Sequence, residues 1–279
     1  MTEVFALPGG LVAADGHVHA DAEVRALSGN DEQWLQSLPP NASVASVVSG
    51  LLARVVVRIG TLDAPGDVVR DLIVADREFA LLQLRRITIG AGFATVLACP
   101  ACADRMDVTF TADDIPVERR PLGVRTFERE LRGRDGVPFR IVFHLPTGAD
   151  QEAAAREGDV VAALVSACVE QVEGGAPVSR VLDTTALRDL DREIEALVPG
   201  VELAMDLTCP GCGHAFVAEF DLSQFLLEDL RVAGGGLTRD VHKLAFYYHW
   251  AAPQILGLPH DKRRQYLDLI ANELTTVRA

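Results

Sequence analysis

Ala98-Cys-Pro-Ala-Cys102 and Thr208-Cys-Pro-Gly-Cys212 are the two stretches of sequence that decide the fold. Each Cys-Pro-x-Cys follows an apolar run and precedes a segment in which apolar and polar residues alternate. The runs are Phe93–Ala98 and Val201–Thr208, and the alternating apolar residues are Met106, Val108 and Phe110 in one case and Phe216, Ala218 and Phe220 in the other. Because alternation is typical of a half-buried strand, each cysteine pair is predicted to lie in the turn of a β-hairpin.

The similarity between the two regions extends upstream of the cysteines and predicts an internally duplicated chain. Three further pairs of segments match: Leu51–Ile59 with Leu164–Val172, Val69–Arg86 with Val181–Leu197 (around Asp76-Arg77 and Asp191-Arg192), and Phe5–Gly10 with Phe143–Gly148. The predicted unit begins with a strand and two helices. A β-hairpin follows, in which the cysteine knuckle joins two strands. The fold class is therefore α+β, and the two units are expected to share one site.

The helices of each unit are predicted from apolar residues spaced three and four apart. This spacing occurs from Val44 to Val56 and again at Val160, Leu164, Cys168 and Val172. It puts Cys168 on a buried stripe, as a small core residue and not a reactive thiol. The first unit also carries an N-terminal β insertion, Leu11–Leu38, expected to form a strand pair and then a capped turn at Ser28–Asp31.

Three parts of the chain are predicted. Residues 1–122 hold the first unit with its knuckle at 99–102, residues 123–233 hold the second with its knuckle at 209–212, and residues 237–279 form a helical tail. Gly234–Gly236 is the expected hinge before the tail. In the tail, His249 and Trp250 are expected to pack beside Tyr247 and Tyr248. Asp261 is expected to cap the last helix, whose apolar stripe is Leu267, Ile270 and Leu274.

The two knuckles predict a structural zinc site. A Cys-x-x-Cys turn directs two thiolates to one side, and two such turns supply the four soft ligands of tetrahedral Zn²⁺. The predicted metal ligands are Cys99, Cys102, Cys209 and Cys212, brought together across an internal axis between the two units. Two separate zinc sites that borrow His214 or the His17-x-His19 pair remain an alternative, although surface histidines explain these residues more simply.

A thiol-disulfide oxidoreductase is the alternative from another functional class, because Cys-Pro-x-Cys is also a redox pattern in which a helix start activates the first thiolate. Two features of the sequence disfavour it. Each pair is followed by a strand-like segment, and Asp104 and Asp107 flank the first pair and would raise a thiolate pKa. A third hypothesis is a regulatory zinc-ribbon protein that binds nucleic acid.

Composition narrows the function classes. The 279 residues include 26 Lys and Arg against 40 Asp and Glu, a net charge of −14, which disfavours phosphate backbones and anionic lipid surfaces. The Arg-rich stretch 119–134 alternates with acidic residues and is expected to be a solvated or protein-docking face. No apolar stretch reaches a membrane span, and no phosphate loop or nucleophile motif is present, so a cytoplasmic protein without catalytic residues is expected.

Several motifs resemble one known family. The segments Val24–Glu32 and Leu145–Glu152 look like its strand-to-helix openings, and Val241–Trp250 with Ile255–Pro259 is similar to its helical tails. With the knuckles, they resemble the T-even phage baseplate hub assembly family and zinc-knuckle proteins of contractile injection systems. The resemblance implies a non-enzymatic assembly factor or minor structural component that contacts baseplate, tube or other tail proteins. Ala103 departs from the glycine usual after the first knuckle.

Overall fold

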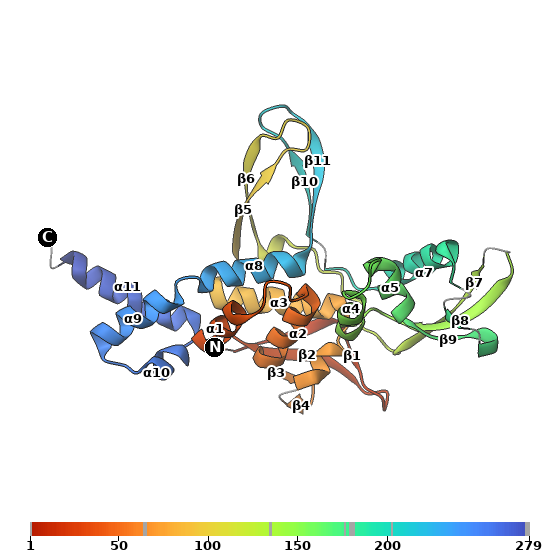
Figure 1. Cartoon of the computed structure of the whole chain (residues 1–279), viewed down its shortest axis with the longest axis horizontal. Helices are drawn as coiled ribbons and strands as arrows, with labels where there is room; N and C mark the ends of the chain where they lie inside the picture. The colour runs from red at the N-terminus through yellow and green to blue at the C-terminus, as the bar shows by residue number, and fades with distance from the viewer. Residues whose placement is uncertain are drawn as a thin grey trace.

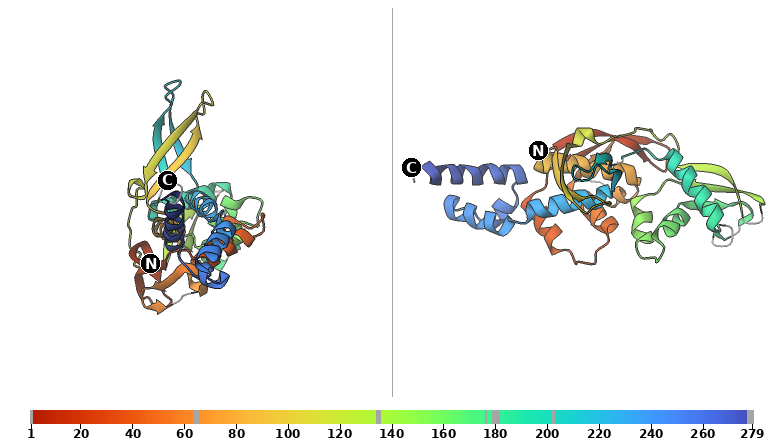
Figure 2. Two further views of the ribbon diagram at one scale, coloured as in Figure 1. Left: turned by 90° about the vertical axis from the view of Figure 1, so that its left-hand side faces the viewer. Right: turned by 90° about the horizontal axis from the view of Figure 1, so that it is seen from above.

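The computed structural model describes residues 2–276 except 64, 65, 134, 135, 176, 179–181 and 202. Val181, Arg134 and residues 277–279, which belong to predicted segments, lie outside the described residues. The molecule is elongated: the helical tail lies at one end of its long axis, and a small sheet of the second half lies at the other (Figure 1). Two β-hairpins project together from the middle of the body, as the turned views also show (Figure 2).

The chain alternates small antiparallel sheets with helices, which confirms the α+β class. Residues up to Thr111 form β1 Thr2–Val12, β2 Val18–Arg25, α1 Gly29–Ser37, α2 Val44–Val55, β3 Val56–Ile59, β4 Leu62–Asp63, α3 Val74–Ile89, β5 Gly92–Ala98 and β6 Arg105–Thr111. The second half forms β7 Thr126–Arg132, β8 Pro138–His144, α4 Gly148–Ala154, α5 Val160–Ala167, β9 Val169–Val172, α7 Thr184–Leu197, β10 Leu203–Thr208 and β11 Ala215–Phe220. The remaining helices are α8 Leu222–Gly234, α9 Leu237–Tyr248, α10 Ala252–Leu256 and α11 His260–Thr276.

The two halves place their sheets in the same order along the chain. One sheet has the order β1-β2-β3-β4 and the other has the order β7-β8-β9, with antiparallel pairing throughout. A register shift occurs between Glu23 and Val24 where β2 pairs with β3, and between Val142 and Phe143 where β8 pairs with β9. Strand order and bulge position are thus common to both halves.

The predicted match between Phe5–Gly10 and Phe143–Gly148 joins segments with different structures. Phe5–Gly10 lies inside β1, whereas Phe143–Gly148 runs from the end of β8 into the start of α4. The segment that shares the latter structure is Val24–Gly29, because it joins β2 to α1. The segment Leu11–Leu38, predicted as an insertion, contains β2 and α1, and these have counterparts in β8 and α4.

The Asp-Arg match also fails in the structure. Asp76 and Arg77 lie in the first turn of α3 and are almost fully buried, whereas Asp191 and Arg192 lie in the middle of α7 and the Arg192 side chain is exposed. The predicted helix through Cys168 and Val172 ends earlier than expected, at Ala167, since Val172 belongs to β9. Cys168 itself is fully buried, as predicted.

A single apolar cluster connects both halves. It includes core residues of α2 and α3 and also Ile141, Phe143, Leu190 and Ile194 of the second half. Helix α8 follows the second hairpin in sequence, yet its buried residues Leu226 and Leu230 join this same cluster. The predicted boundaries at residues 122 and 233 therefore separate stretches of sequence that fold around a common core.

The tail has three helices, as predicted, and a small apolar cluster of its own. Leu244, Ile255, Leu267 and Ile270 form that cluster, and the rings of Tyr248, Trp250 and Tyr266 pack against it. Three other expectations for the tail are wrong. His249 and Tyr247 are exposed and do not pack in the core, Asp261 lies inside the first turn of α11 instead of capping it, and Leu274 is exposed. None of the helices in the described part of the chain is long and apolar enough to cross a membrane.

Candidate functional site

The two predicted knuckles form the same backbone turn at the tips of the hairpins β5–β6 and β10–β11. In the first turn the N–H of Cys99 donates to the carbonyl of Asp104 and the N–H of Ala103 donates to the carbonyl of Cys99, both at 2.9 Å. In the second turn Cys209 and Gly213 make the corresponding bonds, also at 2.9 Å. The residue after each second cysteine has a positive φ, 61° at Ala103 and 73° at Gly213.

The hairpins bring all four predicted cysteines together. The Sγ of Cys99 lies 3.7 Å from that of Cys212, and the Sγ of Cys102 lies 3.7 Å from that of Cys209. All four sulfurs lie within 4.8 Å of one another. Each close pair joins one hairpin to the other, and one cysteine of each pair is buried while its partner is exposed. The cluster therefore links residues more than 100 positions apart in the sequence.

This arrangement fits a tetrahedral metal ion. With Zn–S bonds of about 2.3 Å, the sulfurs of a regular tetrahedron lie about 3.8 Å apart, close to the observed separations. Desolvation opposes ionisation of Cys99, but hydrogen bonds from the backbone N–H groups of Cys102 and Ala101 and from nearby thiols lower its pKa to about 7. Such N–H donors are the usual outer contacts of thiolate ligands.

The histidines considered as borrowed ligands do not join this cluster. The ring of His214 stacks on Phe216, with the ring centroids 6.1 Å apart. His17 and His19 contact each other edge to face at 4.7 Å, and the backbone N–H of Thr61 lies 3.4 Å from Nδ1 of the buried His19. Within the described residues, none of these three histidines belongs to a group that could hold a metal ion.

A second group of metal-ligating residue types, which the sequence analysis missed, consists of His144, Asp150 and Cys168. Oδ2 of Asp150 accepts hydrogen bonds from the backbone N–H and the hydroxyl of Thr147 and lies 3.0 Å from Nε2 of His144. Burial alone would raise the pKa of Asp150, but these contacts lower it. Desolvation, followed by the nearby Asp150, raises the pKa of Cys168 to about 12, so this thiol stays protonated.

The first half contains a matching cap that explains this group. Asp31 accepts from the N–H and hydroxyl of Ser28 and forms an ion pair with Arg25, six residues earlier, at 2.6 Å. His144 likewise lies six residues before Asp150. In both halves a side chain from the preceding strand contacts the carboxylate that caps the next helix, so the group around Asp150 has a structural explanation.

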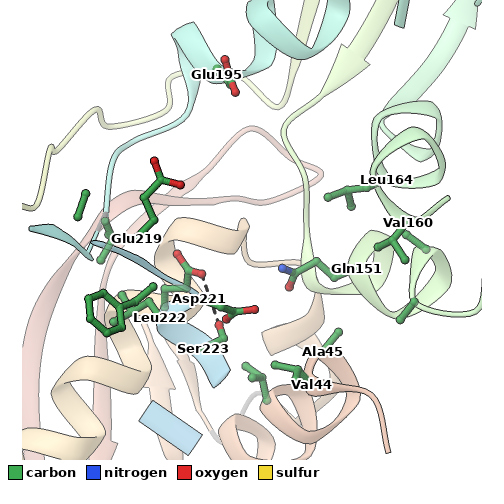
Figure 3. Close-up of a pocket in the computed structure, with 17 residues that line it drawn as sticks. Val44, Ala45, Gln151, Val160, Leu164, Glu195, Glu219, Asp221, Leu222 and Ser223 are labelled. Carbon is green, nitrogen blue, oxygen red and sulfur yellow. Dashed lines mark hydrogen bonds between the residues drawn. The ribbon is translucent and has the colours of Figure 1, made fainter. Parts of the chain in front are cut away.

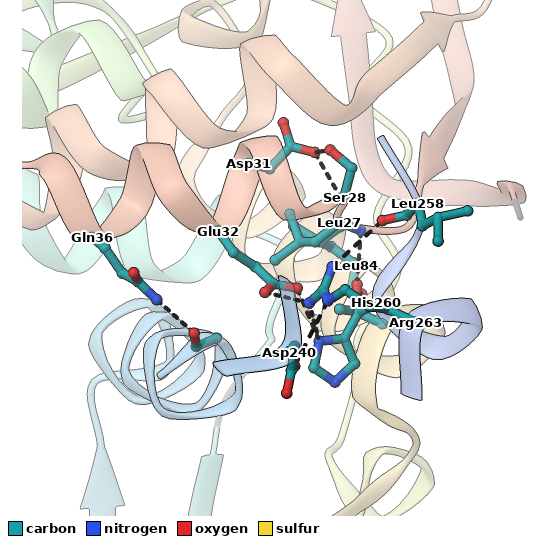
Figure 4. A network of polar contacts seen from close by, with 12 residues as sticks. Leu27, Ser28, Asp31, Glu32, Gln36, Leu84, Asp240, Leu258, His260 and Arg263 are labelled. Carbon is teal, nitrogen blue, oxygen red and sulfur yellow. Dashed lines mark hydrogen bonds and ion pairs between the residues drawn. The ribbon is translucent and has the colours of Figure 1, made fainter. Parts of the chain in front are cut away.

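The start of α11 is fixed against the start of α1 by a buried polar network (Figure 4). Nη2 of Arg263 donates to Oε2 of Glu32 at 2.5 Å, and Nδ1 of His260 lies 2.9 Å from Oε1. Both Glu32 and Arg263 are almost fully buried. Burial alone would raise the pKa of Glu32, but its bonds to His260 and Arg263 lower it. The tail is therefore anchored to the body, beyond the predicted glycine hinge, by a compensated pair of charges.

The two halves are joined by a contact with the same backbone pattern. An antiparallel bridge pairs Ser28 with Pro259 at the tail, and another pairs Ile73 with Thr147 between the halves. Two backbone hydrogen bonds flank each bridge. An arginine four residues into one helix of each contact, Arg263 or Arg77, is buried. Sequence patterns could not reveal these contacts, because each joins distant segments with no periodic signal.

Comparison with known proteins gives one family. The sequence profile of the family described as T4 bacteriophage base plate protein matches residues 40–227, a segment that includes both knuckles. No curated protein and no solved structure matches the chain. The match confirms the resemblance seen in the sequence and supports a structural or assembly role in a baseplate. Since it covers more than half of the chain, the protein belongs to the T4 bacteriophage base plate protein family.

Proposed function

We propose that the protein is a non-enzymatic assembly factor or minor structural component of the baseplate of a phage-like contractile tail. Family membership is the observation that carries this proposal. Its partners are baseplate, tube or other tail proteins, and it works in the cytoplasm or within the assembled particle. It acts through protein contacts and does not bind nucleic acid, in keeping with its net charge of −14.

We further propose that Cys99, Cys102, Cys209 and Cys212 bind one structural zinc ion that fixes the two hairpins to each other. The distances between the sulfurs support this, since the two Sγ atoms of each close pair lie 3.7 Å apart. The halves are proposed to have arisen by duplication, which explains why they share strand order and bulge position. Zinc shared between equivalent hairpins would then give the projecting tip one rigid shape for docking.

A thiol-disulfide oxidoreductase is the alternative that the cysteine motif leaves open. In a redox site of this type, the N-terminus of a helix activates the first thiolate. Here a strand follows each cysteine pair instead, β6 after Cys102 and β11 after Cys212. Each cysteine also has its 3.7 Å neighbour on the other hairpin, an arrangement better suited to a shared ligand set. These observations favour the structural role.

Zinc content tests the metal proposal. We expect the reduced protein to carry close to one zinc per chain and to lose thermal stability when a strong chelator removes it. Cys99→Ser and Cys209→Ser should each lose the metal, whereas Cys168→Ala, which changes a cysteine outside the cluster, should keep it. Zinc-free protein that melts at the same temperature with and without chelator, and that reduces disulfides, would favour the enzyme.

Fractionation of producing cells tests the baseplate role. The tagged protein is captured from particle and soluble fractions after ultracentrifugation, and bound proteins are identified by mass spectrometry. Recovery with sheath, tube or baseplate proteins in the particle fraction would make it a structural component. Recovery with one tail protein in the soluble fraction would make it an assembly factor. Recovery with no tail protein in either fraction would contradict the proposal.

A further inference from the structure

Charge is distributed unevenly between the tail and the rest of the chain. Residues 237–279 carry six Lys and Arg against four Asp and Glu, a net charge of +2, whereas residues 1–236 carry 20 against 36, a net charge of −16. The two lysines of the chain, Lys243 and Lys262, are both in the tail. The tail also projects from one end of the molecule, where it can reach another surface (Figure 1).

The tail carries an open apolar groove between α9 and α11. The groove has a volume of about 400 Å³, and none of the described residues that line it carries a carboxylate. Its described lining residues are His242, Lys243, Phe246, Tyr247, Leu267, Ile270, Ala271 and Leu274. Phe246 is 66% exposed and Tyr247 is 41% exposed, although both are large aromatic residues. Lys243 has no ion-pair partner among the residues that the structure describes. The groove is thus apolar with a cationic edge.

A larger cavity of opposite charge lies between the two halves of the body, with a volume of about 750 Å³ (Figure 3). Glu195, Glu219 and Asp221 lie along one side of it, and Val160 and Leu164 lie on the opposite side. Glu78 also lines the cavity, and no Lys or Arg occurs among its described lining residues. Glu195 and Glu219 are exposed, and neither has an ion-pair partner in the described part of the chain.

We propose that the tail of one copy of this chain docks into the cavity between the halves of a second copy. Phe246 and Tyr247 cover the apolar side of the cavity, and Lys243 meets the carboxylates of Glu195 and Glu219. Opposite charges set the orientation, and the apolar contact supplies the stability.

The two surfaces differ, so the contact joins one end of a copy to the middle of the next. A contact of this kind is heterologous and leads to a closed ring or an open chain of subunits, not to a symmetric dimer. A tail-to-tail contact is disfavoured by charge, because it would bring the lysines of two tails together. The inference rests on the surfaces of the body and the tail and is independent of zinc binding.

Sedimentation velocity of the full chain, from micromolar to submillimolar concentration, tests the contact. Wild-type protein should associate as concentration rises. A tail variant, Lys243→Glu with Phe246→Asp, and a cavity variant, Glu195→Lys with Glu219→Lys, should each weaken association by roughly 30-fold or more. All four residues are exposed, so both variants should keep the fold, which circular dichroism checks.

Mixing the two variants gives the decisive result. The tail variant keeps an intact cavity and the cavity variant keeps an intact tail, so the mixture should associate at concentrations where neither variant associates alone. Wild-type protein that stays monomeric throughout, or a tail variant that associates like wild type, would overturn the proposal. A cavity variant that still associates with itself would also overturn it and would point to tail-to-tail pairing. Zinc content and capture of tail proteins test the proposed function separately.

Discussion

The two halves of the molecule dock a helix start in the same way but stabilise the contact differently. In the first half the start of α1 receives α11, and the buried Arg263 meets the carboxylate of Glu32. In the second half the start of α4 receives α3, and the buried Arg77 donates to the carbonyls of Val69 and Ala45 and to Ser49.

Gln151 stands four residues after the bridging Thr147, where the first half has Glu32 four residues after Ser28. The backbone pairing is thus common to both contacts, while the residue at this position decides whether the contact contains a buried ion pair. Desolvation lowers the pKa of Arg77 to about 10, and Glu152 partly offsets that shift. The comparison shows that one backbone geometry serves both a charged tail anchor and an interface between halves held largely by neutral acceptors.

The largest expected effect comes from Arg263→Met. It leaves Glu32 buried with His260 as its remaining partner, and removal of one member of a buried pair costs about 3–5 kcal/mol. We expect the tail to detach from the body, so that amides of α11 exchange faster with deuterium and protease cleaves near Gly235 and Gly236. The double variant Glu32→Gln/Arg263→Met should recover much of the loss.

Arg77→Met is the matched variant for this prediction. It removes hydrogen bonds to neutral acceptors and should cost about 1–3 kcal/mol, with the effect in the body and not in the tail. If both arginine variants destabilise the same region by equal amounts, the proposed difference between the two contacts is wrong.

The second effect concerns the buried carboxylate of Asp76. Asp76 lies 23 residues before Cys99, and the residue 23 positions before Cys209 is Ala186, so the second half has no carboxylate at the corresponding position. Desolvation raises the pKa of Asp76 to about 6, against hydrogen bonds from the N–H groups of Gly9 and Gly10. A raised carboxyl pKa means that the folded state binds the proton more tightly than the unfolded state, so this group's contribution to stability falls as pH rises from about 4 to 6.

We therefore expect wild type to gain about 1 kcal/mol relative to Asp76→Asn when pH falls from 7 to 5, as measured by chemical unfolding. Glu32→Gln is the contrasting variant, because the lowered pKa of Glu32 makes its contribution disappear only as pH falls below its ordinary value of 4.5. A stability difference between wild type and Asp76→Asn that is constant from pH 7 to 5 would contradict the prediction.

The smallest effect separates the two knuckles. Ala103 has a φ of 61°, a conformation that suits glycine, and the equivalent residue in the second knuckle is Gly213. Ala103→Gly should stabilise the protein by a few tenths to about 1 kcal/mol, because it relieves this strain, and Gly213→Ala should destabilise it by a similar amount. Thermal unfolding of the reduced protein measures both. Equal and opposite shifts would show that the knuckles are interchangeable, whereas a destabilising Ala103→Gly would show that they are not.

Local pattern was sufficient where a segment forms its structure through neighbours in sequence. The spacing from Val44 predicted α2 almost to the residue, and the alternation around the cysteines predicted both hairpins. The capped turn at Ser28–Asp31 was also predictable, since a capping box needs residues only three apart. The predicted equivalence of Asp76-Arg77 and Asp191-Arg192 was wrong, because an Asp-Arg pair in the sequence does not indicate whether the two side chains are buried.

The sequence by itself determined the α+β class, the hairpins with their paired cysteines, the tail helices and the resemblance to baseplate proteins. Only the tertiary structure decided that all four sulfurs meet, that α8 completes the core of the first half, and that Glu32 receives Arg263 from the tail. The physical reason is the separation in sequence between the interacting residues. Hydrogen-bond periodicity and capping act over a few residues and leave a pattern in the sequence, whereas contacts between residues 100 or more positions apart depend on how the complete chain packs.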